Sequence, residues 1–341
     1  MGIKEWFLKP FKDLEDQNAS VQVIPEEPEL EVPISQDVLY HPETQPTIFR
    51  PDTFDTYIGQ ERAKSILKAY IKGVKENNAL FPHILIHGKA GTGKTTLAKI
   101  VAHEVDVSLV EVITSSIKHF WKLKMMINQN EGNFLFLDEI HALERDMAEQ
   151  FYTIMEDFTY NGDPVSHFTI VGATTEIGEI LKTRKPFYDR FKIIIELEDY
   201  STEDLTRIIE QYQEKIFPDK DIAENVFEEI SINCRTIPRM AIRLLEATVF
   251  VGDVIQVLRH FGILYKGYNI NDLKALKYIE YNKKGVGLQS IASFLGTSKE
   301  NYLYQTEPYL LQNQMILRTP RGRKISEKGS ELIKILEQVE I

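Results

Sequence analysis

Residues 88–95, Gly-Lys-Ala-Gly-Thr-Gly-Lys-Thr, match the pattern G-x-x-x-x-G-K-[S/T] at every fixed position. An apolar run precedes them and a helical pattern follows, which is the context that a phosphate-binding loop requires. In such a loop, glycines let backbone N–H groups wrap phosphates, the lysine reaches the β- and γ-phosphates, and the hydroxyl ligates Mg²⁺. We therefore expect a nucleotide site formed by Gly88, Gly91, Gly93, Lys94, Thr95 and Thr96.

Two adjacent carboxylates follow a second apolar run, in Leu-Phe-Leu-Asp-Glu-Ile-His at residues 135–141. A buried strand here would deliver both acids to one edge of a sheet. We expect Asp138 to hold the Mg²⁺ shell and Glu139 to polarise the attacking water. For His141 we expect a structural role, because no histidine or cysteine partner lies at metal-ligand spacing.

A third expected strand, residues 168–174, ends in a threonine and is followed by Thr175. A hydroxyl at this edge can sense the γ-phosphate and orient the water. A capping role would explain Thr175 equally well, so both interpretations stay open from these residues alone.

Strands alternate with helical patterns, including residues 61–76 and 147–158. This alternation predicts an α/β fold with a parallel sheet covered on both faces. We assign residues 49–198 to this core. Residues 199–265 show helical patterns without a strand signal, which predicts a small helical lid.

The C-terminal residues, 266–341, have the pattern of a winged helix. Three helices are expected, at 271–281, 288–295 and 299–312, followed by two short strands around a Pro-Arg-Gly turn. Phosphate contact by this turn would give affinity for DNA without base specificity; the alternative is a solvated basic turn. Its basic residues are Arg318, Arg321, Arg323 and Lys324.

The charge is unevenly distributed along the chain. The net charge is −11 over 341 residues, but the first 50 residues carry −6 and residues 266–341 carry +4. A basic end on an acidic body is compatible with a local DNA-binding surface. Residues 1–48 are rich in Glu, Pro and Gln, so we expect a flexible acidic arm.

The remaining composition suggests a cytoplasmic protein. Hydrophobic residues make up 43% of the chain, and no apolar run is long enough to span a membrane. The N-terminus does not have the pattern of a secretory signal. Cys234 is the only cysteine, so an internal disulfide is impossible, as expected in a reducing compartment.

The phosphate loop, acid pair, polar strand end and lid together resemble the AAA+ class of ATPases. Further strings resemble the RuvB family of Holliday-junction branch-migration ATPases and follow in that family's order. The most specific is EPYLLQNQMILRTPRGR (307–323), because general AAA+ loaders lack it. The others include FRPDTFDTYIGQERAK (49–64), IVGATTEIG (170–178) and RTIPRMAIRLL (235–245). The resemblance covers about residues 49–330.

The resemblance implies roles that spacing alone does not reveal. Arg190 matches the arginine finger that acts on a neighbour's ATP, and Arg239 matches the second sensor, which contacts the γ-phosphate within its own chain. A finger supplied by a neighbour requires an oligomer, and the family forms hexameric rings on duplex DNA. Phe49, Arg50, Tyr200, Glu156, Asp157 and Phe158 match the family's nucleotide surroundings, and Lys299, Arg318 and Arg323 match its DNA contacts.

Two features depart from the family pattern. The family's long β-hairpin, which docks onto its partner RuvA, is reduced to residues 159–167 with a turn at Asn161-Gly162. The shortening predicts recruitment by a partner other than RuvA. In addition, Tyr188 replaces the first arginine of the finger segment.

Three hypotheses follow. The leading one is an ATP-driven motor that moves branched DNA. The second is an AAA+ loader or remodeller of a protein–DNA complex, although no zinc motif or collar domain is visible. The third is a scaffold that only binds ATP. The presence of the candidate catalytic residues argues against it: Lys94, Asp138, Glu139 and Arg190.

Overall fold

The structure is a computed structural model in which residues 48–114, 117 and 119–338 are described. They all belong to one unit, residues 47–341. The expected N-terminal arm, apart from Ile48, lies outside the described residues. None of the described helices is long and apolar enough to cross a membrane.

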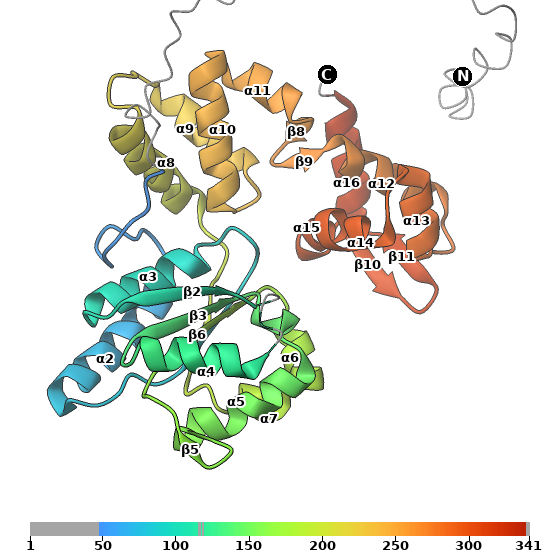
Figure 1. Ribbon diagram of the computed structural model, residues 1–341. Coiled ribbons are helices and arrows are strands. Elements are labelled where there is room, and N and C mark those ends of the chain that lie inside the picture. Colours follow the sequence, from blue (N-terminus) through green and yellow to red (C-terminus); the bar gives the residue numbers. More distant parts are fainter. Residues whose placement is uncertain (1–47, 115–116, 118, 339–341) are drawn as a thin grey trace, which may run out of the picture. The chain divides into compact units, whose positions relative to one another are not determined.

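A five-stranded parallel sheet forms the centre of the nucleotide-binding core, in the order β2-β3-β6-β1-β7 (Figure 1). The three strands expected from the sequence are confirmed. Two short strands, β2 and β7, were not predicted. The strands are β1 (Ile84–His87), β2 (Leu109–Ile113), β3 (Phe134–Asp138), β6 (Thr169–Thr174) and β7 (Ile193–Glu196).

Helices cover both faces of this sheet, as the nearly continuous burial of its strands requires. One hydrophobic cluster joins the sheet to α2 (Glu61–Asn77) and α3 (Lys94–Glu104). A second joins the other face to α4 and α5 and to the short helices before β7. These are α4 (Phe120–Gln129), α5 (Arg145–Asp157), α6 (Ile177–Thr183) and α7 (Lys185–Tyr188).

The predicted short hairpin is present. It consists of β4 (Thr159–Tyr160) and β5 (Asp163–Pro164), paired antiparallel. Asn161 and Gly162 both have positive φ, at 52° and 85°, which is the requirement of a tight two-residue hairpin turn.

Four helices with their own hydrophobic cluster follow β7, which confirms the expected helical region. Ser201 begins the first of them, and its hydroxyl accepts a hydrogen bond from the Asp204 backbone at 3.0 Å. The helices are α8 (Thr202–Ile216), α9 (Glu224–Asn233), α10 (Pro238–Val251) and α11 (Val254–His260). The small β8–β9 hairpin (Ile263–Tyr265 and Tyr268–Asn269) comes next and was not predicted.

The C-terminal part is a winged helix with a separate core. Its expected third helix is not continuous, because a π-helical turn at Tyr302–Thr306 separates α14 from α15. The elements are α12 (Ile270–Tyr281), α13 (Leu288–Leu295), α14 (Lys299–Asn301), α15 (Glu307–Gln312), β10 (Ile316–Thr319), β11 (Gly322–Ile325) and α16 (Glu327–Gln338). We call the antiparallel pair β10–β11 the wing.

Candidate functional site

The phosphate loop connects the end of β1 to the start of α3, as predicted. Gly91 and Gly93 have positive φ, at 79° and 99°, a conformation that favours glycine. A Cβ atom at Gly91 would lie 2.9 Å from the Arg239 side chain, and one at Gly93 would lie 2.8 Å from the Tyr57 hydroxyl. Both glycines are therefore required by close packing as well as by backbone geometry.

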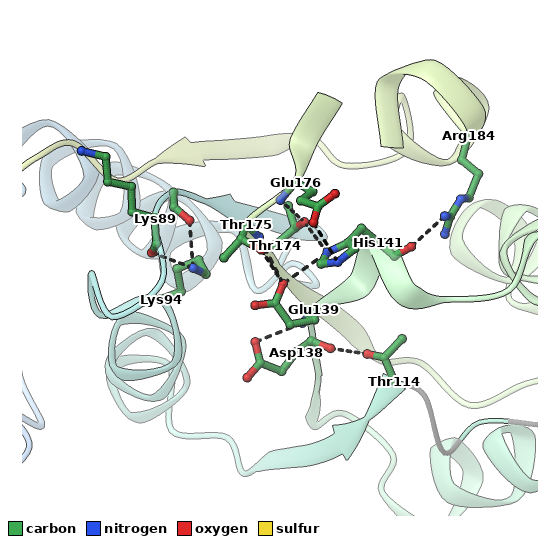
Figure 2. A network of polar contacts seen from close by, with 11 residues as sticks. Lys89, Lys94, Thr114, Asp138, Glu139, His141, Thr174, Thr175, Glu176 and Arg184 are labelled. Carbon is green, nitrogen blue, oxygen red and sulfur yellow. Dashed lines mark hydrogen bonds and ion pairs between the residues drawn. The ribbon is translucent and has the colours of Figure 1, made fainter. Parts of the chain in front are cut away.

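Lys94 is buried at the first position of α3 and is folded back onto the loop (Figure 2). Its Nζ donates to the carbonyl oxygens of Gly88 and Lys89, both at 2.9 Å. Burial lowers the pKa of Lys94, against the opposing effect of Glu139 and Asp138. The ammonium thus lies within the electrostatic reach of both acids, where it can meet a phosphate bound by the loop.

The two acids lie at the end of β3, as expected. The backbone N–H of Glu139 donates to Asp138 Oδ1 at 3.0 Å, and Glu139 has the unusual φ of 48°. Thr175 donates to Glu139 Oε2 twice, from its backbone N at 3.2 Å and from its hydroxyl at 3.0 Å. Figure 2 shows this contact joining the ends of two neighbouring strands. Thr175 is thereby placed beside the carboxylate, as a sensing role would require.

His141 belongs to the same network, which the sequence did not indicate. Its Nδ1 lies 3.2 Å from Glu139 Oε2 and 3.0 Å from the Thr174 hydroxyl. Arg184, also missed, is buried and donates to the carbonyl oxygens of His141 and Leu143 (Figure 2). These contacts fix the backbone directly after the acid pair, and they arise from tertiary packing that no local motif records.

Two tyrosines support the phosphate loop from beneath. The Tyr200 hydroxyl lies 3.1 Å from the Thr92 carbonyl oxygen, to which it can donate, and 3.1 Å from the Tyr57 hydroxyl, with which it shares a second hydrogen bond. Burial raises the pKa of both phenols, so they stay neutral hydrogen-bonding groups. The sequence indicated Tyr200 but not Tyr57, although Tyr57 lies in the segment 49–64 that carried the family resemblance.

The residues expected near the base occupy different surroundings. Phe49 packs against the helical cluster of α8–α11, whereas Arg50 is exposed. Within the described part of the chain, neither Phe49 nor Arg50 makes a polar contact with the phosphate loop.

Arg239 lies at the start of α10 and meets the phosphate loop. Its backbone N–H donates to the Gly91 carbonyl at 3.4 Å. Its positive charge also lowers the pKa of Lys94, although burial is the largest cause of that shift. The guanidinium is exposed. This position is compatible with contact to a bound phosphate within the same chain.

Arg190 lies between α5 and α7, where its Nε donates to the Tyr152 carbonyl at 3.4 Å and its Nη1 to the Pro186 carbonyl at 2.7 Å. Its Nη2 pairs with Glu156 Oε1 at 3.2 Å, and its guanidinium stacks 4.8 Å from the centre of the Tyr152 ring. The structure therefore brings together Arg190 and Glu156, two residues that the resemblance selected. The neighbouring Asp157 ends α5, and Phe158 packs against His167 and Phe168.

The Thr95 hydroxyl and the Asp138 carboxylate are oxygen donors that suit a hard divalent cation bound together with a nucleoside triphosphate. Mg²⁺ takes one or two protein oxygens together with phosphates and water, rather than a cage of protein ligands. The Asp138 carboxylate is exposed and the Thr95 hydroxyl is half-buried. Among the described residues no cluster of three or more His, Cys, Asp or Glu side chains could hold a metal ion.

The predicted DNA-binding residues all lie in the winged helix, but their surroundings differ. Lys299 begins α14, and Arg321 lies in the wing turn, where both are exposed. Arg318 and Arg323 face each other across the wing and both contact Glu307. Arg323 keeps only 16% of its side chain exposed, against 57% for Arg318. The basic turn is thus not uniformly solvated.

Comparison with known proteins identifies the family. The family model for the Holliday junction DNA helicase RuvB P-loop domain matches residues 49–197, and that for the RuvB C-terminal winged helix domain matches residues 265–334. The Holliday junction branch migration complex subunit RuvB of Campylobacter lari is 35% identical over 86% of this chain and 93% of its own length. The chain belongs to the RuvB family.

Other family members and solved structures agree with this assignment. The RuvB subunit of Ehrlichia ruminantium is 36% identical over 82% of this chain and 90% of its own length. The Thermotoga maritima RuvB Holliday junction branch migration motor superposes with a TM-score of 0.73 at 32% identity, covering 84% of this chain and 99% of that one. The ORC2 protein of Aeropyrum pernix, 15% identical with a TM-score of 0.55, shares the fold alone.

The fold class expected from the sequence is therefore confirmed, as an AAA+ core with a C-terminal winged helix. Nucleotide binding follows from the P-loop domain. The roles of individual residues remain predictions, as do the domain boundaries at 48, 198 and 265.

Proposed function

We propose that this chain is an ATP-driven motor that moves DNA and drives branch migration of Holliday junctions. The observation that carries the proposal is the Glu139–Thr175 contact beside the phosphate loop, in a chain that also has a basic wing. A carboxylate held by the polar end of a neighbouring strand can respond to a γ-phosphate, and the wing can hold the duplex. The Campylobacter lari relative is named as a subunit of a Holliday junction branch migration complex.

In the proposed reaction, each residue acts on charge or on a proton. Lys94 leaves the carbonyl oxygens of Gly88 and Lys89 to neutralise the β- and γ-phosphates, while Arg239 contacts the γ-phosphate. Mg²⁺, when bound through Thr95 and Asp138, supplies further charge neutralisation. Glu139 orients water and accepts its proton as the water attacks the γ-phosphorus, while the bond from the γ-phosphorus to the β–γ bridging oxygen breaks and ADP leaves.

Thr175 couples this chemistry to the nucleotide state. Its hydroxyl and backbone N–H both donate to Glu139 Oε2 in the structure. A γ-phosphate is a competing acceptor for the same hydroxyl, so its arrival would free the carboxylate to hold water. We propose that hydrolysis returns Glu139 to Thr175, which makes the contact a resting state.

The motor is proposed to work as a hexameric ring. In a single chain Arg190 is held by Glu156 and by the carbonyl oxygens of Tyr152 and Pro186. In a ring it would leave these partners to reach the nucleotide of a neighbouring copy. A guanidinium supplied by a neighbour stabilises the charge of the transferred phosphoryl group and ties hydrolysis to assembly. We also propose that the protein works in the cytoplasm and that a partner other than RuvA recruits it.

The rate of ATP hydrolysis with and without four-way-junction DNA tests this function. We expect junction DNA to stimulate turnover and Glu139→Gln to abolish it, with a loss of at least about 100-fold because a general base is removed. Glu144→Gln is the matched control, since Glu144 is an exposed glutamate in the same loop. DNA-independent turnover would favour the loader hypothesis, and turnover retained in Glu139→Gln would contradict the proposed chemistry.

A further inference from the structure

Glu307 is a fully buried carboxylate next to the wing. Its side chain has 0% of its surface exposed, and it is the first residue of α15. The π-helical turn at Tyr302–Thr306 directly precedes it. A π-helical turn inside an otherwise α-helical stretch is unfavourable, and such turns are frequent at functional sites.

This carboxylate binds one arginine from each strand of the wing. Arg323 donates from Nε to Oε1 at 2.7 Å and from Nη2 to Oε2 at 3.0 Å, and Arg318 donates from Nε to Oε1 at 3.0 Å. The two arginines are directly paired across β10 and β11, so their side chains leave the same face. Glu307 therefore joins α15 to both strands at once.

The charges of this group depend on each other. Burial opposes ionisation of Glu307, but hydrogen bonds from Arg323 and Arg318 outweigh it and hold the pKa of the carboxyl below its ordinary value. The same contact raises the pKa of Arg323. A buried carboxylate without such partners would be strongly unfavourable, so both arginines are fixed in place by it.

The two arginines nevertheless differ in how many of their guanidinium nitrogens bond to Glu307. Arg323 uses two nitrogen atoms on Glu307 and is largely buried, so it serves mainly to hold the wing. Arg318 uses only Nε and is 57% exposed. Glu307 thus holds the Arg318 guanidinium through Nε, and the two Nη groups can donate to an acceptor outside the protein.

We propose that Glu307 is a positioning residue for DNA binding, which fixes the Arg318 guanidinium so that its two Nη groups form a fork for a backbone phosphate. This inference rests on the proposed function, since it assumes that the wing contacts duplex DNA. An arginine already held in one orientation loses less side-chain entropy on binding than a free one. A planar fork also matches the geometry of a phosphate.

The first test compares two glutamate-to-glutamine variants of the full chain in binding to a blunt duplex DNA. Glu307→Gln and Glu327→Gln remove the same charge from the winged helix, but Glu327 is exposed and does not contact the wing arginines. Loss of negative charge alone would strengthen binding in both variants. We expect Glu307→Gln instead to weaken binding about fivefold to tenfold and to lower the salt dependence by about one phosphate contact. Tighter binding by Glu307→Gln, or equal behaviour of the two variants, would overturn the proposal.

A second variant avoids the risk that Glu307→Gln unfolds the wing. Arg318→Lys keeps the positive charge on a residue that is largely exposed, but lysine has a single ammonium nitrogen and cannot present a planar fork of two nitrogens to a phosphate while it pairs with Glu307. We expect its affinity for the duplex to fall about fivefold, whereas Arg259→Lys in α11 should leave it unchanged. Full affinity in Arg318→Lys would overturn the positioning role.

The failure of this inference can be told apart from failure of the proposed function. If Arg318→Ala binds duplex DNA as tightly as the parent protein, Arg318 does not contact DNA and the inference is wrong, whereas the proposed function still stands if junction DNA stimulates turnover that Glu139→Gln abolishes. If Arg318→Ala binds weakly but Glu307→Gln behaves like Glu327→Gln, only the positioning role is overturned.

Discussion

At the scale of single residues, the position of Glu139 decides how the site can work. Its carboxylate is held by donors from Thr175 and lies 3.2 Å from His141. The acid, the threonine and the lysine could be predicted because each belongs to a local motif. The sequence favoured a structural role for His141, because no histidine or cysteine partner lies at metal-ligand spacing. Its contact with Glu139 arises only through the fold.

We predict that His141 positions Glu139 during hydrolysis. His141→Ala should lower kcat about tenfold and leave KM for ATP unchanged, because the substituted group orients the base without touching the nucleotide. His141→Asn should recover most of the rate, since its side-chain nitrogen can occupy the position of Nδ1. Steady-state ATPase kinetics of the two variants check this. A raised KM with normal kcat, or equal loss in both variants, would contradict it.

At the scale of elements, the ends of β1 and β6 are held together by a buried histidine. His83 precedes β1, and its Nδ1 accepts a hydrogen bond from the Ile170 backbone at 2.9 Å, while Nε2 lies 3.3 Å from the Met155 carbonyl. Nδ1 is therefore unprotonated, and a second proton would break the contact with β6. Burial lowers the pKa of His83 to about 4.

This contact predicts acid sensitivity of the core. The pKa of His83 is lower in the folded than in the unfolded chain, so its contribution to stability is complete above pH 6.5 and is lost as pH falls towards 4. The free energy of unfolding should decrease by up to roughly 3 kcal/mol over this range. His83→Asn, which keeps an acceptor for Ile170, should show a flatter pH dependence in chemical denaturation. Equal slopes in the variant and the parent would rule out His83 as the cause.

Some helices and strands could be predicted from the sequence and others could not. β1, β3 and β6 could be predicted because each is an apolar run beside a motif residue. β2 and β7 have no such motif residue beside them, and their place in the sheet depends on parallel pairing with distant residues. The break at Tyr302–Thr306 was missed because helical periodicity looks the same on both sides of a π-helical turn.

At the scale of the whole molecule, the chain combines a phosphate-binding core, a helical region and a basic winged helix. The net charge of −11 would argue against nucleic acid if it were evenly spread, but the C-terminal residues carry +4. Local charge rather than total charge therefore predicts DNA binding. The family assignment agrees with this order of parts, since its two models match residues 49–197 and 265–334.

The central claim is that ATP hydrolysis by this chain moves a DNA junction. Its most direct test is a strand-displacement assay in which a labelled, mobile four-way junction is converted to duplex products, with parent protein and Glu139→Gln compared at saturating ATP. The account predicts ATP-dependent conversion by the parent and none by Glu139→Gln, which should still bind the junction. Hydrolysis of ATP by the parent with no junction conversion at any protein concentration would contradict it.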